Sequence, residues 1–186
     1  MEVGLFSKKQ TAEQFERLAS EEERRVYAVC FHMMGSREDA EDCAQETMLR
    51  AFRAFSSFRR DAAFSTWITR IAMNVCVDAL RKRKDALSLD ALQEEQGFDV
   101  RDESPGVYAQ LEQKERMRLL REGLQSLPPD MRKVIVLRDV QGRDYEEIAG
   151  ILDLPQGTVK SRISRARNKL CEILKKSSEL FSSQSV

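Results

Sequence analysis

Hydrophobic residues recur along most of this 186-residue chain at spacings of three and four positions. That period is typical of amphipathic helices, and no stretch shows the strict alternation of a half-buried strand. We therefore expect an all-α protein. The expected helices span about 11–34, 36–55, 65–84, 107–125 and 130–140, followed by two short helices at 144–152 and 156–170.

Polar residues stand where these helices should begin and end. Thr11 and Gln14 fit a capping box, in which each side chain bonds a free backbone N–H at the helix start. Ser36 and Ser65 are predicted N-caps for the next two helices. Gly35 is expected to end the first helix, because glycine tolerates the backbone that closes a helix.

The most distinctive pattern is the pair of short helices near the C-terminal end. Pro155 suits a helix start, and the apolar residues around it form one continuous stripe on each helix, which predicts a helix-turn-helix. The stripes comprise Ile148, Ala149 and Leu152, then Val159, Ile163, Ala166 and Leu170. The opposite side of the second helix carries Thr158, Ser161, Ser164, Arg165 and Asn168, flanked by Lys160, Arg162, Arg167 and Lys169.

The charge of the second short helix helps to decide whether it binds DNA or only faces solvent. Residues 155–176 hold seven Lys or Arg against one acidic residue, whereas the whole chain balances 31 against 31. A basic face can also be a solvated surface, and the same helix pair occurs in helical interaction domains. The concentration of cations on one helix of a neutral chain favours DNA binding.

Loss of periodicity divides the chain into two parts. Residues 86–106 contain Gly97 and the run Ser104, Pro105 and Gly106, which predicts a flexible linker. We expect one small helical domain at 11–85 and a second, containing the helix-turn-helix, at 107–175.

The second predicted helix has an outward face with an apolar centre and a polar rim. Its inward residues are Ala40, Ala44, Thr47 and Ala51. Its outward residues are Asp42, Gln45, Glu46, Leu49 and Arg53. Such a face is either a protein-docking patch or a solvated surface with one exposed Leu, and the residues alone leave both open.

The third predicted helix combines aromatic and basic residues at its start and along one side. The loop before it carries Arg59 and Arg60, and Phe64 and Trp67 follow. Aromatic rings beside cations suit unstacked bases, although each ring can equally belong to the core. The side away from the apolar stripe carries Arg70, Asn74 and Arg81.

Composition excludes several kinds of site. The four cysteines are isolated and His32 is the single histidine, so we expect no zinc site, other metal site or disulfide framework. Asp39, Glu41 and Asp42 suit a helix N-terminus without any metal. No Gly-rich phosphate loop or nucleophile motif is present, so we expect no enzyme, no cofactor and no small-molecule substrate. No apolar run is long enough for membrane insertion, and we expect a cytoplasmic protein.

Three segments, residues 39–52, 64–84 and 127–170, resemble the corresponding motifs of bacterial sigma factors of the extracytoplasmic-function (ECF) group in the sigma-70 family. The resemblance covers about residues 11–175. It implies an alternative sigma factor that binds core RNA polymerase and directs promoter-specific initiation. Like other members of this group, the chain would have an anti-sigma factor as a partner.

The resemblance also implies roles for the residues named above. The family's second helix docks on the clamp helices of the polymerase beta-prime subunit, which assigns that contact to Asp39, Asp42, Gln45, Glu46, Leu49 and Arg53. Capture of the melted minus-ten element would fall to Arg59, Arg60, Phe64, Trp67, Arg70, Asn74 and Arg81. The C-terminal domain would contact the beta flap and read the minus-35 element as duplex through Thr158, Lys160, Ser161, Arg162, Ser164 and Arg165.

Two rival classes remain besides an enzyme. A dimeric transcription factor with a helix-turn-helix would bind DNA without polymerase and would need a sensory site in its first half. An anti-sigma or adaptor protein would leave the basic recognition helix unexplained.

Overall fold

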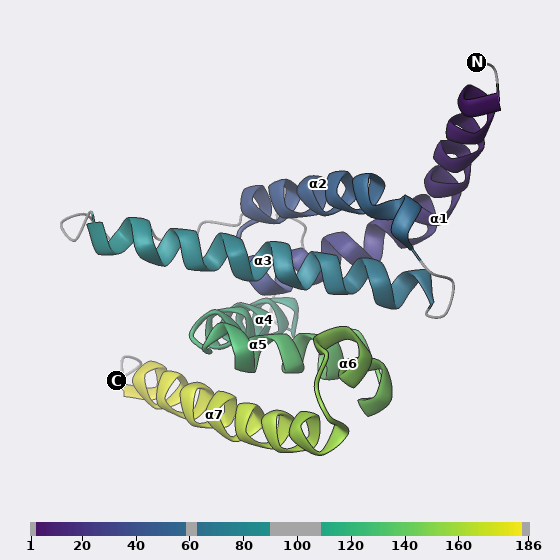
Figure 1. The fold of residues 1–186 in the computed structure, drawn as a ribbon. Coiled ribbons are helices and arrows are strands. Elements are labelled where there is room, and N and C mark those ends of the chain that lie inside the picture. Colours follow the sequence, from purple (N-terminus) through teal and green to yellow (C-terminus); the bar gives the residue numbers. More distant parts are fainter. Residues whose placement is uncertain (1–2, 59–62, 90–108, 184–186) are drawn as a thin grey trace.

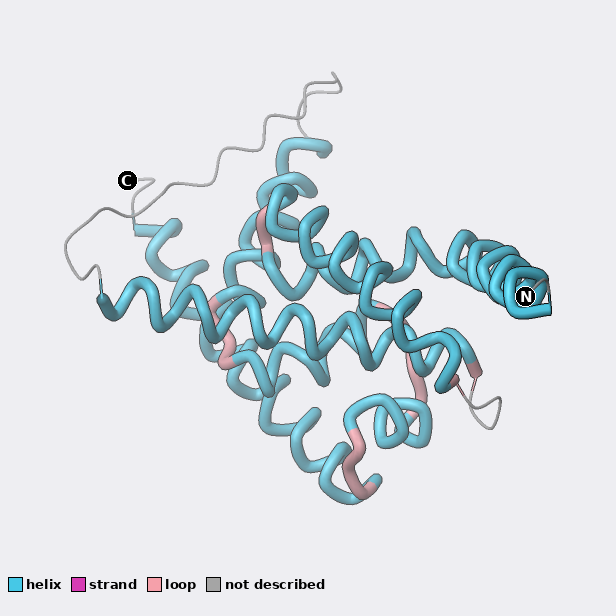
Figure 2. Tube along the Cα trace, turned by 45° about the horizontal axis from the view of Figure 1, so that its top comes forward, coloured by secondary structure: helices cyan, strands magenta, loops and turns pink. Residues whose placement is uncertain are grey.

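The computed structural model describes residues 3–58, 63–89 and 109–183, which form helices and contain no strand (Figure 2). The first half comprises α1 (Val3–Met34), α2 (Arg37–Ala54), the short 3-10 turn η1 (Phe55–Ser57) and α3 (Phe64–Leu89). The second half comprises α4 (Ala109–Gln125), α5 (Pro129–Ile135), η2 (Val136–Val140), α6 (Tyr145–Leu152) and α7 (Gln156–Ser183). Figure 1 shows α3 between these groups, with α1 and α2 on one side and α4–α7 on the other.

The boundary between α1 and α2 follows the sequence prediction. Gly35 adopts a φ of +78° and its N–H bonds the carbonyl of Phe31 at 2.8 Å. The Ser36 hydroxyl then accepts the N–H of Asp39 at 3.3 Å, which satisfies one of the free donors of the next helix. A glycine stop followed by a serine cap therefore turns the chain within two residues.

Two predicted helix starts are wrong. Helix α1 begins at Val3, so Thr11 lies inside the helix and does not cap it. Helix α3 begins at Phe64, and the carbonyl of Ala63 accepts the N–H groups of Thr66 and Trp67 at 3.0 and 3.1 Å. The predicted cap Ser65 is thus already helical, because the backbone closes the first turn one residue earlier than the polar side chain suggested.

The predicted linker is shorter at its start, and the rest of it lies outside the described residues. Helix α3 continues to Leu89, past the expected end near residue 84, because residues 85–89 contain no glycine or proline. Helix α4 begins at Ala109, two residues after its expected start. The remaining predicted linker, residues 90–106, lies outside the part of the chain that the structure describes.

The fifth predicted helix changes its winding midway. Pro129 opens α5, and the chain passes at Val136 into the π-helical turn η2, where the N–H of Gln141 bonds the carbonyl of Val136 at 3.0 Å. Gly142 then takes a φ of +69° and leads into α6. The wider turn adds one residue per turn before the helix-turn-helix begins.

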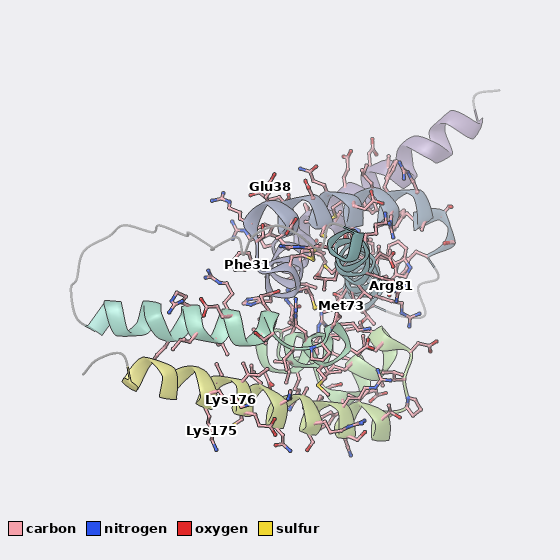
Figure 3. The ribbon with its side chains drawn as sticks, turned by 90° about the vertical axis from the view of Figure 1, so that its left-hand side faces the viewer. Phe31, Glu38, Met73, Arg81, Lys175 and Lys176 are labelled. Carbon is pink, nitrogen blue, oxygen red and sulfur yellow. The ribbon has the colours of Figure 1, made fainter. Side chains whose placement is uncertain are left out.

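The apolar core continues through both halves. Helix α3 buries more of its circumference than one amphipathic stripe predicts, because it packs on α1 and α2 and also on α5 and α6. Ile68, Ala72 and Val75 are buried, and Met73 and Cys76 are buried as well. Figure 3 looks along α3 and shows Met73 on the side that faces the second half.

Candidate protein and nucleic-acid interfaces

Helix α2 presents the predicted docking patch to solvent. Its buried residues are Ala40, Cys43, Thr47 and Ala51. The Thr47 hydroxyl is satisfied inside the helix, where it donates to the carbonyl of Cys43 at 2.7 Å. Because this side is closed against α1 and α3, Asp42, Gln45 and Arg53 are exposed around Leu49, whose exposure is 50%.

Two acids of the predicted docking set already have partners. Arg50 Nε donates to Glu46 Oε1 at 2.7 Å, and Arg83 Nη1 lies 3.3 Å from Asp39 Oδ2. These ion pairs are more than a third exposed, so they contribute little to stability. They nevertheless orient the carboxylates along the rim of the patch.

The patch extends to Phe52, which sequence reasoning missed. Phe52 is 51% exposed, and its ring meets the edge of Phe15 on α1 at a centroid distance of 5.3 Å. It follows Leu49 by three positions, so both lie on one side of α2. The three-residue spacing from Leu49 could have indicated this position, but a phenylalanine in an amphipathic helix is equally typical of the core.

The aromatic residues at the start of α3 form one cluster. The ring of Trp67 lies 5.0 Å from that of Phe58 and 5.5 Å from that of Phe64, and Phe55 lies 6.1 Å from Phe64. Phe64 and Trp67 are both half-buried. They therefore support the core while keeping part of each ring at the surface. Arg59 and Arg60 lie outside the described residues.

The polar side of α3 faces the second half of the molecule. Arg70, Asn74 and Arg81 are exposed, and Arg70 Nη2 donates to the backbone carbonyl of Gly150 on α6. Asp130 on α5 has a lowered pKa, because it accepts a bond from Lys133 and also feels the positive charges of Arg162 and Arg81. Its carboxylate thus lies in the combined field of cations from α3 and α7.

The helix-turn-helix is confirmed and is locally well specified. Asp144 accepts the N–H of Glu147 at 2.8 Å, and the Glu147 carboxylate accepts the N–H of Asp144 at 3.0 Å, which completes a capping box. Asp153 ends α6 with a φ of +54°, a left-handed conformation that Asp tolerates better than most residues. Ile148, Ile151, Val159, Ile163 and Ala166 are buried between α6, α7 and α5.

The outward face of α7 carries most of the predicted minus-35 set. Lys160, Ser161, Ser164 and Arg165 are exposed, whereas Thr158 and Arg162 are half-buried. Arg165 Nε bonds its own helix at the Ser161 carbonyl, 3.3 Å away. Lys160 Nζ lies 5.6 Å from the ring centre of Tyr145, and the Arg138 guanidinium lies 4.9 Å from the same ring. The α7 face is therefore positive and open to a large ligand.

Three of the four cysteines are packing residues. Cys30, Cys43 and Cys76 come from α1, α2 and α3 and are buried, whereas Cys171 on α7 is exposed. Hydrogen bonding with Cys30 and Cys43, together with burial, raises the pKa of the Cys76 thiol. In the described ranges, no three His, Cys, Asp or Glu side chains are placed to hold a metal ion. Within those ranges, too, no helix is long and apolar enough to cross a membrane.

Family profiles match both halves of the chain. The profile described as Sigma-70 region 2 matches residues 18–86, and the one described as Sigma-70, region 4 matches residues 117–170. The first range covers the second half of α1, all of α2 and α3 as far as residue 86, and the second runs from α4 into α7.

Curated relatives resemble the chain over both halves. It is 40% identical over 142 residues to the ECF RNA polymerase sigma-E factors of Escherichia coli and Salmonella typhi, which covers 71% of this chain and 72% of theirs. It is 37% identical over 155 residues to the ECF sigma factor SigE of Mycolicibacterium smegmatis, covering 83% of this chain and 59% of that protein.

Solved structures show a similar arrangement. RpoE from Bartonella quintana, in complex with the anti-sigma factor NepR, aligns with a TM-score of 0.70 at 27% identity, covering 88% of this chain and 98% of that one. CnrH, in complex with the cytosolic domain of CnrY, aligns with a TM-score of 0.64 at 25% identity, covering 91% and 95%.

Proposed function

Because this chain belongs to the ECF group of the sigma-70 family and is an alternative sigma factor for promoter-specific transcription, we propose how its surfaces divide that task. Helix α2 docks on the clamp helices of the polymerase beta-prime subunit. Helix α3 and the loop before it capture the minus-ten element. The α4–α7 domain contacts the beta flap and reads the minus-35 element.

The docking role rests on the exposed patch of α2. A half-exposed Leu49 beside a half-exposed Phe52, ringed by Asp42, Gln45 and Arg53, has the apolar centre and polar rim of a protein interface. A neighbouring pair of exposed apolar side chains favours a partner over a solvated face with one stray Leu. Asp39 and Glu46 supply the rest of the rim.

The minus-ten role rests on the aromatic and basic side of α3. Half-buried Phe64 and Trp67 keep ring surface for a flipped base, whose unstacking costs a few kcal/mol that stacking on the rings offsets. Arg70, Asn74 and Arg81 follow the same helix and suit the strand backbone. Arg59 and Arg60 would complete the set from the preceding loop.

The minus-35 role rests on the exposed face of α7. This exposed face is the main observation that supports the proposed function. Ser161, Ser164 and Arg165 are exposed on a helix whose opposite side is buried, which is the geometry of a major-groove reader. Lys160, Arg162 and Thr158 flank them and suit phosphate contacts.

The remaining assignments follow from this task. The working units are a first domain that ends with α3 at Leu89 and a second domain that begins with α4 at Ala109. The protein acts in the cytoplasm, where polymerase and promoter lie, without a cofactor or a catalytic step of its own. The neighbouring structures of sigma and anti-sigma complexes support an anti-sigma factor as an inhibitory partner.

A reconstituted transcription assay tests this assignment. Purified bacterial core polymerase is mixed with the protein and with candidate promoters, including the one upstream of its own gene. We expect a transcript with a defined start that requires the protein and is lost in the Leu49→Ala, Asp42→Ala double variant. The matched control is Glu23→Ala, which removes an exposed acid from α1. Specific duplex binding by the free protein without any association with core polymerase would instead favour a classical repressor or activator.

A further inference from the structure

A tyrosine at the start of the helix-turn-helix has cations from two other elements over its ring. Tyr145 is the first residue of α6 and is half-buried. The guanidinium of Arg138, on η2, lies 4.9 Å from the ring centre, and Nζ of Lys160, on α7, lies 5.6 Å from the same centre. Both distances are in the range in which an aromatic face attracts a cation. The ring therefore brings two positive charges together beside the outward face of α7.

The backbone around the ring fixes this arrangement. The capping box of Asp144 and Glu147 sets the first turn of α6, and Tyr145 lies inside that turn. Arg138 belongs to the π-helical turn η2, and its Nη1 donates to the Arg143 carbonyl at 2.7 Å. Turns of this kind often occur at functional sites. The guanidinium of Arg138 is thus anchored at a second point beside the ring.

These two cations differ from neighbouring ones in their partners. Arg167 is held by the carboxylate of Asp139, and Nη1 of Arg143 lies 2.6 Å from Oε1 of Glu147. Among the described residues, neither cation on the tyrosine ring forms an ion pair with a carboxylate. Two positive charges that share one ring repel each other, and an anion between them would offset that repulsion. The arrangement therefore suits an anionic ligand.

The pair lies where a DNA strand would pass. In a helix-turn-helix the second helix enters the major groove while the first crosses the backbone, so phosphates lie near the junction of the two helices. Tyr145 opens the first helix, and Lys160 lies on the exposed side of the second, next to Ser161. An ammonium and a guanidinium offer several N–H donors to phosphate oxygens. The chemistry and the position both match a DNA phosphate.

We propose that Tyr145 is a positioning residue of the minus-35 interface, which holds Arg138 and Lys160 as a pair of phosphate-binding cations. This inference rests on the proposed function and adds Arg138 and Tyr145 to its residues. A free Lys or Arg side chain samples many rotamers and loses that freedom when it binds a phosphate. The ring restricts both side chains before DNA arrives, and such preorganisation raises affinity. Phosphates carry no base sequence, so the pair contributes affinity and salt dependence but not base preference.

Binding of the holoenzyme at several salt concentrations tests this role. The full-length protein is assembled with core polymerase, and fluorescence anisotropy follows its binding to a promoter duplex from which it starts a transcript. We expect Tyr145→Leu to weaken binding about two- to fivefold at low salt and to lower the slope of log affinity against log salt by about 1. Tyr145→Phe keeps an aromatic face and should bind as wild type does. In both variants, the ratio of affinities for this duplex and for one with a substituted minus-35 base should stay unchanged.

A double-mutant cycle distinguishes positioning from a merely structural role. In a background of Arg138→Gln with Lys160→Gln, Tyr145→Leu should cause no further loss of affinity, because the cations that the ring holds are absent. Each glutamine variant alone should lower the salt slope by about 1 while the ring is retained. Tyr27→Leu is the matched control, because this half-buried tyrosine stacks on Phe31 within α1 and lies outside the α4–α7 domain. It should keep the wild-type salt slope.

The outcomes separate this inference from the proposed function. If the wild-type holoenzyme does not bind a promoter specifically, the proposed function fails and the inference falls with it. If wild type binds but Tyr145→Leu keeps its affinity and salt slope, or if Tyr145→Phe loses as much as Tyr145→Leu, the positioning role is overturned. An undiminished loss in the double-glutamine background overturns it as well. If Tyr145→Leu also lowers the unfolding midpoint, the single glutamine variants decide, and a wild-type salt slope in both overturns the proposal.

Discussion

Arg167 on α7 is held by the carboxylate of Asp139 on η2, with Nε 3.1 Å from Oδ2 and a second bond from Nη2 to Oδ1. This ion pair raises the pKa of Arg167. Arg165, two positions earlier on the same helix, bonds only the Ser161 carbonyl of its own helix among its described contacts. The two arginines are chemically identical, yet one is committed to the fold and the other faces outward.

Replacing Arg165 should therefore weaken DNA binding, whereas replacing a cation outside the recognition face of α7 should not. We expect Arg165→Ala to weaken holoenzyme binding to a minus-35 duplex by about 1–3 kcal/mol if it reads a base. If it holds a phosphate, the slope of log affinity against log salt should fall by about 1. Titration of a fluorescent duplex at several salt concentrations measures both. Lys176→Ala, on the same helix beyond the predicted face (Figure 3), should match wild type, and equal losses in both variants would contradict a specific role.

Truncating Leu49 tests the docking patch. A half-exposed Leu on a monomer contributes little to folding, but at the centre of an interface its truncation costs about 1–2 kcal/mol, or roughly 5- to 30-fold in Kd. We expect Leu49→Ala to weaken core polymerase binding by that factor while the unfolding midpoint stays unchanged. Fluorescence anisotropy with labelled protein measures the affinity. Wild-type affinity for core polymerase would show that Leu49 is simply solvated.

The capping box of Asp144 should govern the stability of the recognition unit. Asp144→Ala removes the acceptor for the Glu147 N–H and should lower the free energy of unfolding by about 0.5–2 kcal/mol. Asp144→Asn retains a capping oxygen and should recover most of the loss. Urea denaturation followed by circular dichroism measures both variants. Equal stability of the alanine and asparagine variants would rule out the cap as the cause.

Acid should destabilise the protein through His32. Burial, and secondarily the positive charge of Arg121, lower the pKa of His32 in the folded protein. Between that lowered pKa and the ordinary value of about 6.5, the unfolded chain binds more protons, so the free energy of unfolding falls as pH falls through this range. His32→Gln should flatten that dependence. The chain has one histidine, so its ring resonance can be titrated directly, and Arg121→Gln should raise the measured pKa. An identical pH dependence of stability in His32→Gln would contradict this account.

Local patterns in the sequence were sufficient for the helices and for the outward face of α7. The apolar stripe of Val159, Ile163 and Ala166 lies within one helix, and its three- and four-residue spacing fixes which side is buried wherever the helix packs. The same reasoning placed Leu49 at the surface of α2. Helix starts were less reliable, since Ser65 resembles a cap in sequence although the first turn closes on Ala63.

The contacts between the halves were decided by tertiary structure alone. Arg132 and Met33 are 99 positions apart, and Arg70 and Gly150 are 80 apart, so no local period relates them. From the sequence, Arg70 was expected to be an exposed cation on the polar side of its helix, and nothing distinguished Arg132 from other helix residues. Packing between the halves buries Met73, engages Arg70 and desolvates Arg132, because these effects depend on which surfaces meet and not on the pattern within any one helix.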